Sequence, residues 1–365
     1  MAIDRRLLLN VDWGLLLAAL LLSGIGVLTI LSATHGGRFA GIHNRQLYAL
    51  GLGLLGLLIT LTLDYRRLAD RSPLLYVGIV AALLGVLLFG PRIAGTRRWF
   101  LMGPLGQVQP SEFAKLVVAL LLAKVFSEYR RETLGLRDVV APGAAVGLVI
   151  LLIAAEPDLG TAACLVPMFL AVAFLAGLRM RAVLALLTVM VVTGGIWWQF
   201  AAMPYQKQRV YNFLEPGRDP QGAGWQKNQS QIAVGSGGFL GKGYRQGSQS
   251  QLGYLPARQT DFIFSVLAEE TGFLGVAVVL GLYLFVLWRS FETALLARDR
   301  VGAFVVAGLT ATLAFQVVYN VAMVAGLVPV KGLPLPLMSY GGSSVLSSLL
   351  SLGLILNVRM RRFAN

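Results

Sequence analysis

Acidic residues stand beside or within long apolar segments at four places in the sequence. They are Glu112, Asp158, Asp261 and the adjacent pair Glu269 and Glu270. An ionised carboxylate at or in a membrane is costly, so such residues are candidates for function by default. Carboxylates can accept a proton from a reacting group or help to hold a divalent cation. These residues therefore form the first set of candidate site residues.

Each carboxylate also has a structural explanation that the sequence leaves open. Glu112 and Lys115 are three residues apart, so they would lie on one helix face as an ion pair. Asp158 and Asp261 each precede an apolar segment, where Asp commonly caps a helix. The two adjacent glutamates lie about two turns into an apolar run and would need a polar cavity or a buried basic partner.

Basic residues accompany these carboxylates in two polar segments. Arg97 and Arg98 precede an aromatic pair, and Lys207 and Arg209 open a long polar stretch. Guanidinium groups match phosphate oxygens bidentately. A cavity with basic walls and a few carboxylates would suit a lipid with an anionic diphosphate head. The alternative is a solvated rim that contacts anionic lipid.

Two glycine-rich stretches have the composition of ligand loops. Gly341 and Gly342 precede Ser343 and Ser344 at the start of the last apolar segment. Such small residues let helices pack closely, and bare N–H groups at a helix start can bind an anion. The stretch 235–243 lacks the glycine spacing and the hydroxyl residue of a Walker loop. It is predicted to be a turn-rich loop, with a backbone nest for a lipid-linked phosphate as the alternative.

The composition limits which elements can position these residues. Of 365 residues, 56% are hydrophobic and 13% are charged, with a mean hydropathy of +0.72. This excludes a soluble enzyme, a disordered chain and a nucleic-acid-binding module, because globular proteins carry about 25% charged residues. The net charge of +14 fits a membrane protein with basic cytoplasmic loops. One cysteine and two histidines argue against disulfides and zinc sites.

Ten apolar segments are long enough to be candidate membrane spans, since a span needs about 20 residues. Their predicted limits are 12–33, 47–64, 74–90, 111–127, 139–155, 161–177, 182–201, 262–288, 303–327 and 339–357. The predicted fold is an all-α polytopic membrane protein that forms one integral membrane domain over residues 1–365. A large extracytoplasmic loop, 202–261, is expected between spans seven and eight, with short helices on the outer membrane face.

Lys and Arg residues in the short loops predict the orientation. They concentrate in alternate loops, which the positive-inside rule assigns to the cytoplasm. Both termini are therefore expected in the cytoplasm, and the carboxylates and basic residues above face outward. The first apolar run is too long for the core of a signal peptide, which is about 7–15 residues.

Several motifs in the same order resemble those of the SEDS family, the bacterial shape, elongation, division and sporulation proteins. The motifs are Gly95–Trp99, Gln109–Lys115, Glu156–Thr161, Asp219-Pro220, Gly224–Gln226, Gly235–Gly238, Thr260–Phe264, Glu269-Glu270 and Ser339–Ser344. The resemblance covers nearly the whole chain and is strongest to the RodA branch, which acts in cell elongation.

The resemblance implies a ten-helix peptidoglycan glycosyltransferase of the bacterial cytoplasmic membrane. Such an enzyme polymerises lipid II, a disaccharide-pentapeptide on undecaprenyl diphosphate, at the outer membrane face. By resemblance, Asp261 is the essential carboxylate. The expected partners are lipid II, membrane lipids and a class B penicillin-binding protein that crosslinks the glycan; no nucleic-acid partner is expected.

The chemistry of this reaction suggests roles for the candidate residues. Lipid II is α-linked and the polymer is β-1,4-linked, so the step inverts and needs a base and positive charge. Asp261 is the predicted base. Basic residues of the outer cavity, or a divalent cation such as Mg²⁺ or Mn²⁺, would stabilise the departing diphosphate. Asp158, Glu112 and Lys115 would shape the cavity.

Two other functional classes remain open from the sequence. A lipid II flippase would use intramembrane Glu112, Lys115, Glu269 and Glu270 to line a path near the midplane of repeated, broken helices. No inverted repeat is evident in the sequence. A membrane scaffold for the penicillin-binding protein would not depend on Asp261 for glycan synthesis.

Overall fold

A computed structural model describes residues 10–35, 41–93, 95–102, 106–129, 131, 133–200, 202–215 and 223–363. The helices are α2 (Trp13–Ala33), α3 (Ile42–Thr62), α4 (Tyr65–Asp70), α5 (Ser72–Phe89), α6 (Pro110–Glu128), α7 (Leu136–Ala155), α8 (Leu159–Leu175), α9 (Met180–Phe200), α10 (Pro204–Leu214), α11 (Ala223–Ser236), α12 (Ser248–Gln251), α13 (Ile263–Leu295), α14 (Arg300–Val324), α15 (Gly342–Met360) and the 3-10 turn η3 (Arg361–Phe363). Two short antiparallel strands, β1 (Phe100–Leu101) and β2 (Gln107–Val108), lie between α5 and α6.

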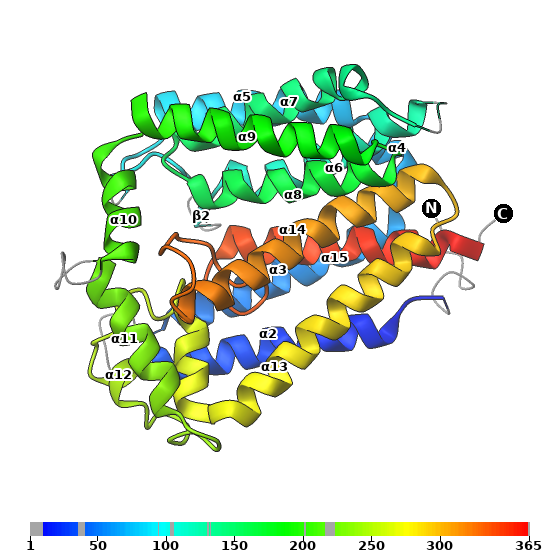
Figure 1. Ribbon diagram of the computed structural model, residues 1–365. Coiled ribbons are helices and arrows are strands. Elements are labelled where there is room, and N and C mark those ends of the chain that lie inside the picture. The colour runs from blue at the N-terminus through cyan, green and yellow to red at the C-terminus, as the bar shows by residue number, and fades with distance from the viewer. Residues whose placement is uncertain are drawn as a thin grey trace.

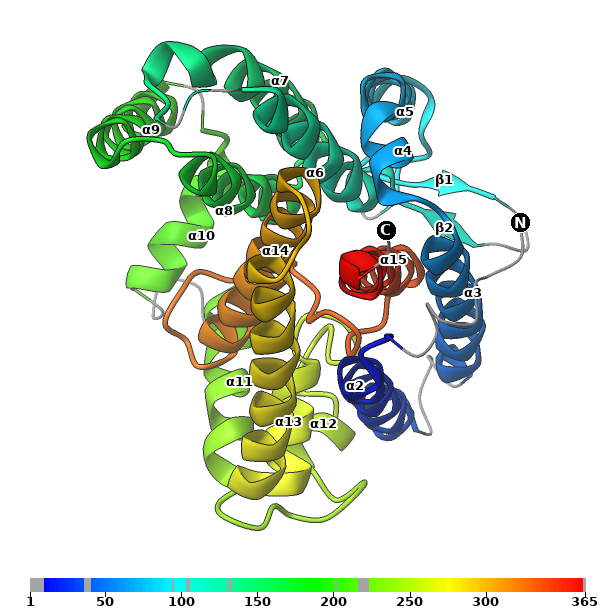
Figure 2. The same ribbon diagram turned by 90° about the vertical axis from the view of Figure 1, so that its right-hand side faces the viewer.

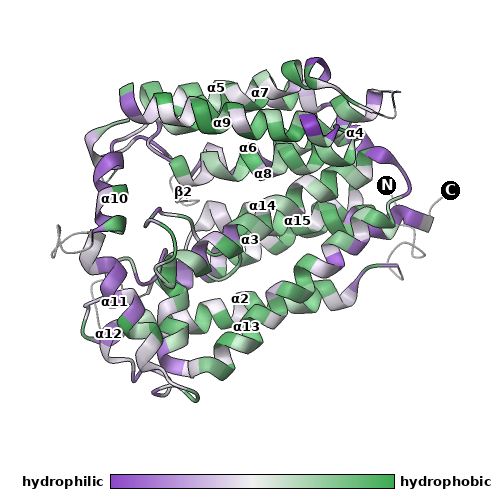
Figure 3. Ribbon diagram, in the orientation of Figure 1, coloured by the Kyte–Doolittle hydropathy of each residue, from purple (hydrophilic) through white to green (hydrophobic). Residues whose placement is uncertain are grey.

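The long helices run side by side in one bundle (Figure 1). Helices α10, α11 and α12 gather at one end of the bundle, and the described C-terminal end lies at the other. Apolar residues dominate the long helices, whereas hydrophilic residues collect in α10 to α12 and at the opposite end (Figure 3). This is the distribution that a membrane-spanning bundle requires.

All ten predicted segments coincide with helices of the structure. Among the described residues, eight helices are long and apolar enough to cross a membrane. The other two predicted spans correspond to α8, which has 17 residues, and α6, which carries charged residues at both ends. The chain is therefore a multi-pass membrane protein. The short helices expected in 202–261 are also present, as α10, α11 and α12.

Helix α15 lies at the centre of the bundle, among α2, α3, α6 and α14 (Figure 2). Small residues allow its close approach to α3. A Cβ atom added at Gly353 would lie 2.0 Å from Thr60 Oγ1, and one added at Gly53 would lie 2.4 Å from Leu349 Cδ1. Nearly every residue of α15 is buried as a result.

The glutamate pair in α13 is buried and fully engaged with the large loop and with α2. Glu269 accepts hydrogen bonds from Lys242 Nζ at 2.8 Å and from the backbone N–H groups of Gln249 and Ser250 at 2.9 and 3.1 Å. Glu270 accepts a hydrogen bond from Ser32 in α2. The predicted buried pairing with a basic residue is thus confirmed for Glu269.

The same loop segment packs against a break in α13. Gly272 has a φ of +64°, a left-handed conformation that favours glycine. Backbone atoms of residues 239–241 approach it so closely that an added Cβ would lie 2.3 Å from Gly241 N. Residues 237–243 therefore close over α13 as a turn-rich loop, whereas Gly235 and Ser236 belong to the end of α11, so the loop prediction is wrong for these two residues.

An ion-pair network closes the end of the bundle opposite to α10–α12. Asp12 Oδ2 lies 2.8 Å from Arg289 Nε and 3.0 Å from Arg359 Nε, and Glu292 Oε2 contacts the same two guanidinium groups at 2.8 and 3.2 Å. The network joins the start of α2 to the last turns of α13 and α15. The side chains of Asp12 and Arg359 are only 2% and 7% exposed.

The replacement Arg359→Met is expected to destabilise the fold. It removes one of two cations that neutralise the buried Asp12 carboxylate, and breaking a buried pair costs on the order of 3 kcal/mol. Thermal unfolding in detergent should therefore show a clearly lower midpoint. The matched control is Arg131→Met, because Arg131 is 76% exposed in its pair with Asp138. Equal midpoints for both variants would contradict a structural role of the network.

Candidate active site

Asp261 lies in a turn directly before α13. The start of α13 lies at the end of the bundle that carries α11 and α12 (Figure 1). The sequence alternative that Asp261 caps α13 is wrong, because the N-cap is Phe262 and it makes no side-chain capping bond. Asp261 is half-buried. Burial raises the pKa of its carboxyl to about 6, with Asp158 adding to the rise and Arg209 and Arg98 opposing it. Such a carboxyl is ionised at neutral pH and is basic enough to take up a proton.

Asp158 is a buried neighbour of Asp261 and has two structural partners. It caps α8, as predicted, by accepting hydrogen bonds from the backbone N–H of Thr161 at 3.1 Å and from Thr161 Oγ1 at 2.9 Å. It also accepts a hydrogen bond from Gln109 Nε2 at 2.8 Å. The carboxylate therefore ties the start of α8 to the start of α6, and it lies within electrostatic range of Asp261.

Arg98 holds the turn between α7 and α8. Its guanidinium donates to the carbonyl of Glu156 at 2.8 Å and to the carbonyl of Pro157. Arg97 donates instead to the carbonyls of Leu87 and Leu88, at the end of α5. The structure thus brings Arg98 into the electrostatic surroundings of Asp261 and uses Arg97 to close α5.

Glu156 is a member of this region that the sequence analysis did not single out by itself. Its side chain is fully buried, and neither carboxyl oxygen has a hydrogen-bond partner among the described residues. Burial raises its pKa to about 8, and Asp158 adds to the rise while Arg98 opposes it. Glu156 is therefore neutral at pH 7. Its position in the predicted Glu156–Thr161 motif was the available sequence signal.

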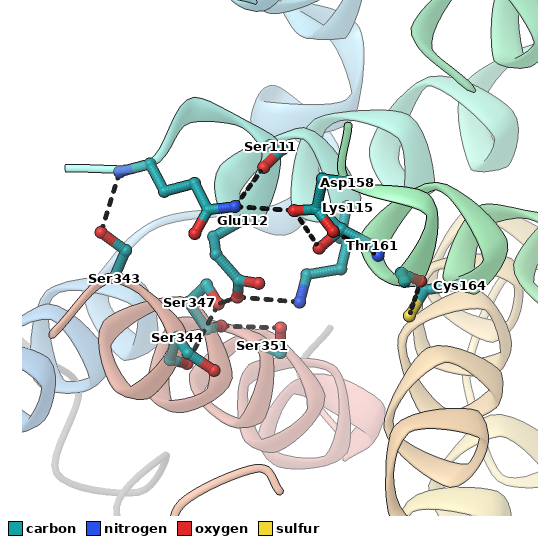
Figure 4. A network of polar contacts seen from close by, with 12 residues as sticks. Ser111, Glu112, Lys115, Asp158, Thr161, Cys164, Ser343, Ser344, Ser347 and Ser351 are labelled. Atoms are coloured by element: carbon teal, nitrogen blue, oxygen red, sulfur yellow. Dashed lines mark hydrogen bonds and ion pairs between the residues drawn. The ribbon is translucent and has the colours of Figure 1, made fainter. Parts of the chain in front are cut away.

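Glu112 and Lys115 form the predicted ion pair inside the bundle (Figure 4). Lys115 Nζ lies 2.9 Å from Glu112 Oε2, and Ser347 Oγ of α15 donates to the same oxygen at 2.8 Å. Both charged side chains are almost completely buried. The pair therefore links α6 to the central helix α15, and Ser347 is a participant that the sequence analysis missed.

The serines at the start of α15 make protein contacts. Ser343 Oγ accepts the backbone N–H of Gln109 at 2.9 Å and donates to the carbonyl of Gln107 at 3.2 Å. The carbonyl of Ser344 accepts a hydrogen bond from Ser347 at 3.1 Å. These contacts favour the packing alternative for this motif, since they join α15 to β2 and to the start of α6.

The basic residues of α10 lie on the polar end of the bundle. Arg209 is exposed and lowers the pKa of Asp261, so it lies within electrostatic range of that carboxylate. Lys207 donates to the carbonyl of Gln199 at 3.5 Å. Lys331, which the sequence analysis did not single out, is partly buried. Burial and the nearby Arg209 lower its pKa.

A small pocket lies beside this basic region. It is lined by Arg209, Asn212, Phe213, Lys227 and Val330. Lys227 Nζ lies 4.5 Å from the centre of the Phe213 ring. The two cationic side chains in this lining, Arg209 and Lys227, favour an anionic group as ligand.

The carboxylates offer limited support for a divalent cation. In the described part of the chain, no three His, Cys, Asp or Glu side chains are grouped to hold a metal ion. Asp261 and Asp158 fit the simpler arrangement in which Mg²⁺ is held by one or two carboxylates together with substrate phosphates. Asp158, however, already accepts hydrogen bonds on both oxygens.

The fold and the site together define a polytopic membrane protein with a carboxylate and basic residues at one polar end of its bundle. Residues 12–363 match the family model for the FtsW, RodA and SpoVE cell cycle proteins. The chain belongs to this family, as its motifs indicated.

Named relatives agree with this assignment. The chain is 37% identical to the peptidoglycan glycosyltransferase MrdB of Escherichia coli strain K12, with 97% of this chain and 94% of that protein covered. A structure described as coordinating polymerization and crosslinking in a peptidoglycan synthase complex matches with a TM-score of 0.84 at 35% identity, covering 97% and 99% of the two chains. RodA of Thermus thermophilus matches with a TM-score of 0.72 at 33% identity, covering 97% and 98%.

Glu156→Gln is expected to remove a pH dependence of stability. The folded protein keeps the Glu156 proton up to about pH 8. An unfolded glutamate loses its proton near pH 4.3. Wild-type stability should therefore fall as pH rises from about 5 to about 8, and the glutamine variant should lack this loss. Thermal unfolding in detergent across this range measures it, with exposed Glu128→Gln as the control. A wild-type-like pH dependence in the variant would refute the neutral state of Glu156.

Proposed function

We propose that this protein is a peptidoglycan glycosyltransferase that polymerises lipid II into β-1,4 glycan strands during cell elongation. The family and its named relatives support the enzyme class. The observation that carries the mechanism is the position of Asp261. It is a half-buried carboxyl with a pKa raised to about 6, within electrostatic range of Arg209 and Arg98, at the polar end of a membrane-spanning bundle.

In the proposed reaction, Asp261 accepts the proton of the acceptor sugar 4-hydroxyl. The hydroxyl oxygen bonds to the anomeric carbon of the donor while the bond from that carbon to the diphosphate oxygen breaks. The configuration inverts, and undecaprenyl diphosphate leaves with the bonding electron pair. Arg209, Arg98 and Lys331 supply positive charge near this point, and preorganised charge is a large source of transition-state stabilisation.

The other predicted site residues take supporting roles in this proposal. Glu112 and Lys115 hold α6 against α15, and Asp158 fixes the start of α8 beside Asp261. Lys207 and the pocket around Lys227 extend the basic surface toward a second lipid diphosphate. A divalent cation held by carboxylates would supply further positive charge for the diphosphate when bound.

The proposal includes an orientation and a partner. In this proposal the chain crosses the bacterial cytoplasmic membrane ten times, with both termini in the cytoplasm and the 202–261 segment, including Asp261, outside. The opposite positions of α10–α12 and the described C-terminal end support this orientation (Figure 1). A class B penicillin-binding protein is the proposed partner, because a closely matching structure concerns a complex that coordinates polymerization with crosslinking.

A lipid II flippase is the alternative that the buried Glu112–Lys115 pair favours. A transporter places such groups near the midplane of its path. In this chain the pair is neutralised and hydrogen-bonded to Ser347. Proteoliposomes separate the two functions, because a polymerase makes glycan strands from lipid II and a flippase only moves it between leaflets.

Asp261→Asn is expected to abolish polymerisation, because an amide cannot take the hydroxyl proton. Removing a general base costs roughly 10²–10⁴ in rate. The measurement is glycan-strand formation from lipid II by the purified protein in liposomes, with the exposed Asp70→Asn as a control that should keep normal activity. Normal strand formation by folded Asp261→Asn would disprove the assignment.

The pH–rate profile is expected to report the ionisation of Asp261. Activity should fall as the pH drops through about 6, because the protonated carboxyl cannot act as a base. Asp158→Asn removes a like charge and should move this acidic limb to lower pH. Arg209→Gln removes an opposing positive charge and should move it to higher pH. Shifts in the same direction would argue that another group controls the limb.

A further inference from the structure

Asp261 sits in a turn whose backbone is fixed by residues far away in the sequence. The carbonyl of Asp261 itself accepts a hydrogen bond from Asn320 Nδ2 of α14 at 3.0 Å. The preceding carbonyl, of Thr260, accepts one from Ser339 Oγ at 2.6 Å. The carbonyl before that, of Gln259, accepts the backbone N–H of Tyr340 at 2.9 Å. Three consecutive carbonyls of the turn are thus each held by a donor from the α14–α15 region.

Asn320 also fixes the wall that faces the carboxylate. Its Nδ2 donates a second hydrogen bond, at 2.8 Å, to the carbonyl of Leu333. The neighbouring residue, Gly332, lies against Asp261, since a Cβ atom added there would be 3.5 Å from Asp261 Oδ2. One amide group therefore binds both the turn that carries the carboxylate and the segment opposite its oxygens.

The same segment reaches the second carboxylate of the site. Leu333 packs on Gly160 in the first turn of α8, where an added Cβ would lie 2.9 Å from Leu333 Cγ. Asp158 caps that turn. The Asn320 amide thus binds both the Asp261 turn and the segment that packs on the Asp158 turn. It thereby fixes the distance between the two turns.

Burying the Asn320 amide costs free energy, and a residue that carries such a cost in the interior is expected to have a specific role. Asn320 is fully buried, and its Oδ1 atom has no hydrogen-bond partner among the described residues. An unsatisfied buried acceptor costs about 1–3 kcal/mol. The two hydrogen bonds that Nδ2 donates offset this cost. The rest of the Asn320 surroundings is an apolar helix bundle.

We propose that Asn320, with Ser339 as its partner, is a positioning residue for the Asp261 carboxylate. This inference rests on the proposed function, in which Asp261 is the base. Neither residue is assigned a contact with the substrate; each acts by holding the backbone of the Asp261 turn. Their loss lets the carboxylate move relative to the reacting hydroxyl, and a displacement of about 1 Å can cost on the order of 10²-fold in rate.

The test uses Asn320→Leu, which removes the donor without adding a charge beside Asp261. Steady-state polymerisation of lipid II in liposomes should show a kcat lowered on the order of 10²-fold and a KM close to that of the wild type. The matched control is Gln316→Met, one turn earlier on α14. Gln316 is also buried and its Nε2 has no partner among the described residues, so its replacement should leave kcat within about twofold of wild type.

Ser339 provides a second variant in case Asn320→Leu does not fold. Ser339→Ala removes the donor to Thr260 and should lower kcat, whereas Ser339→Thr keeps a hydroxyl and should restore most of it. Folded Asn320→Leu or Ser339→Ala protein with wild-type kcat would overturn the proposal, as would a raised KM at unchanged kcat. If the wild-type protein itself makes no glycan, the proposed function fails instead.

Discussion

Charges inside a membrane-spanning bundle must be paired or neutral, and much of this structure follows from that constraint. Glu112 is neutralised by Lys115 and Glu269 by Lys242. Both pairs also receive hydrogen bonds from another part of the chain, so each joins two elements instead of only removing a charge. The contacts that neutralise the buried charges therefore also fix the positions of the helices relative to one another.

The proposed active site lies at the edge of this low-dielectric region. Glu156, fully buried, is held neutral, whereas half-buried Asp261 has its pKa raised only to about 6. Arg209 and Arg98 both oppose the rise at Asp261, whereas only Arg98 opposes it at Glu156. Two carboxyl groups in one region thereby take different protonation states at neutral pH, which is how a site can hold a base beside a structural acid.

The sequence predicted what depends on local spacing. Apolar length located the long helices, the three-residue spacing predicted the Glu112–Lys115 pair, and the position before α8 predicted the cap by Asp158. It did not predict the neighbours of Asp261, because Asn320 and Ser339 are 59 and 79 residues from the carbonyls they bind. Such contacts are decided by how α14 and α15 pack, which no local pattern encodes.

The small residues before and within α15 show how helix packing and hydrogen bonding act together. Ser339 holds the Asp261 turn, Ser343 holds the start of α6, and Ser347 holds Glu112. Small side chains let the central helix approach its neighbours, and their hydroxyls satisfy polar groups that the approach buries. Packing and ligand binding were competing interpretations of this motif. The contacts favour packing, because the serines of this motif bind the Glu112 carboxylate, the backbone before Asp261 and the start of α6.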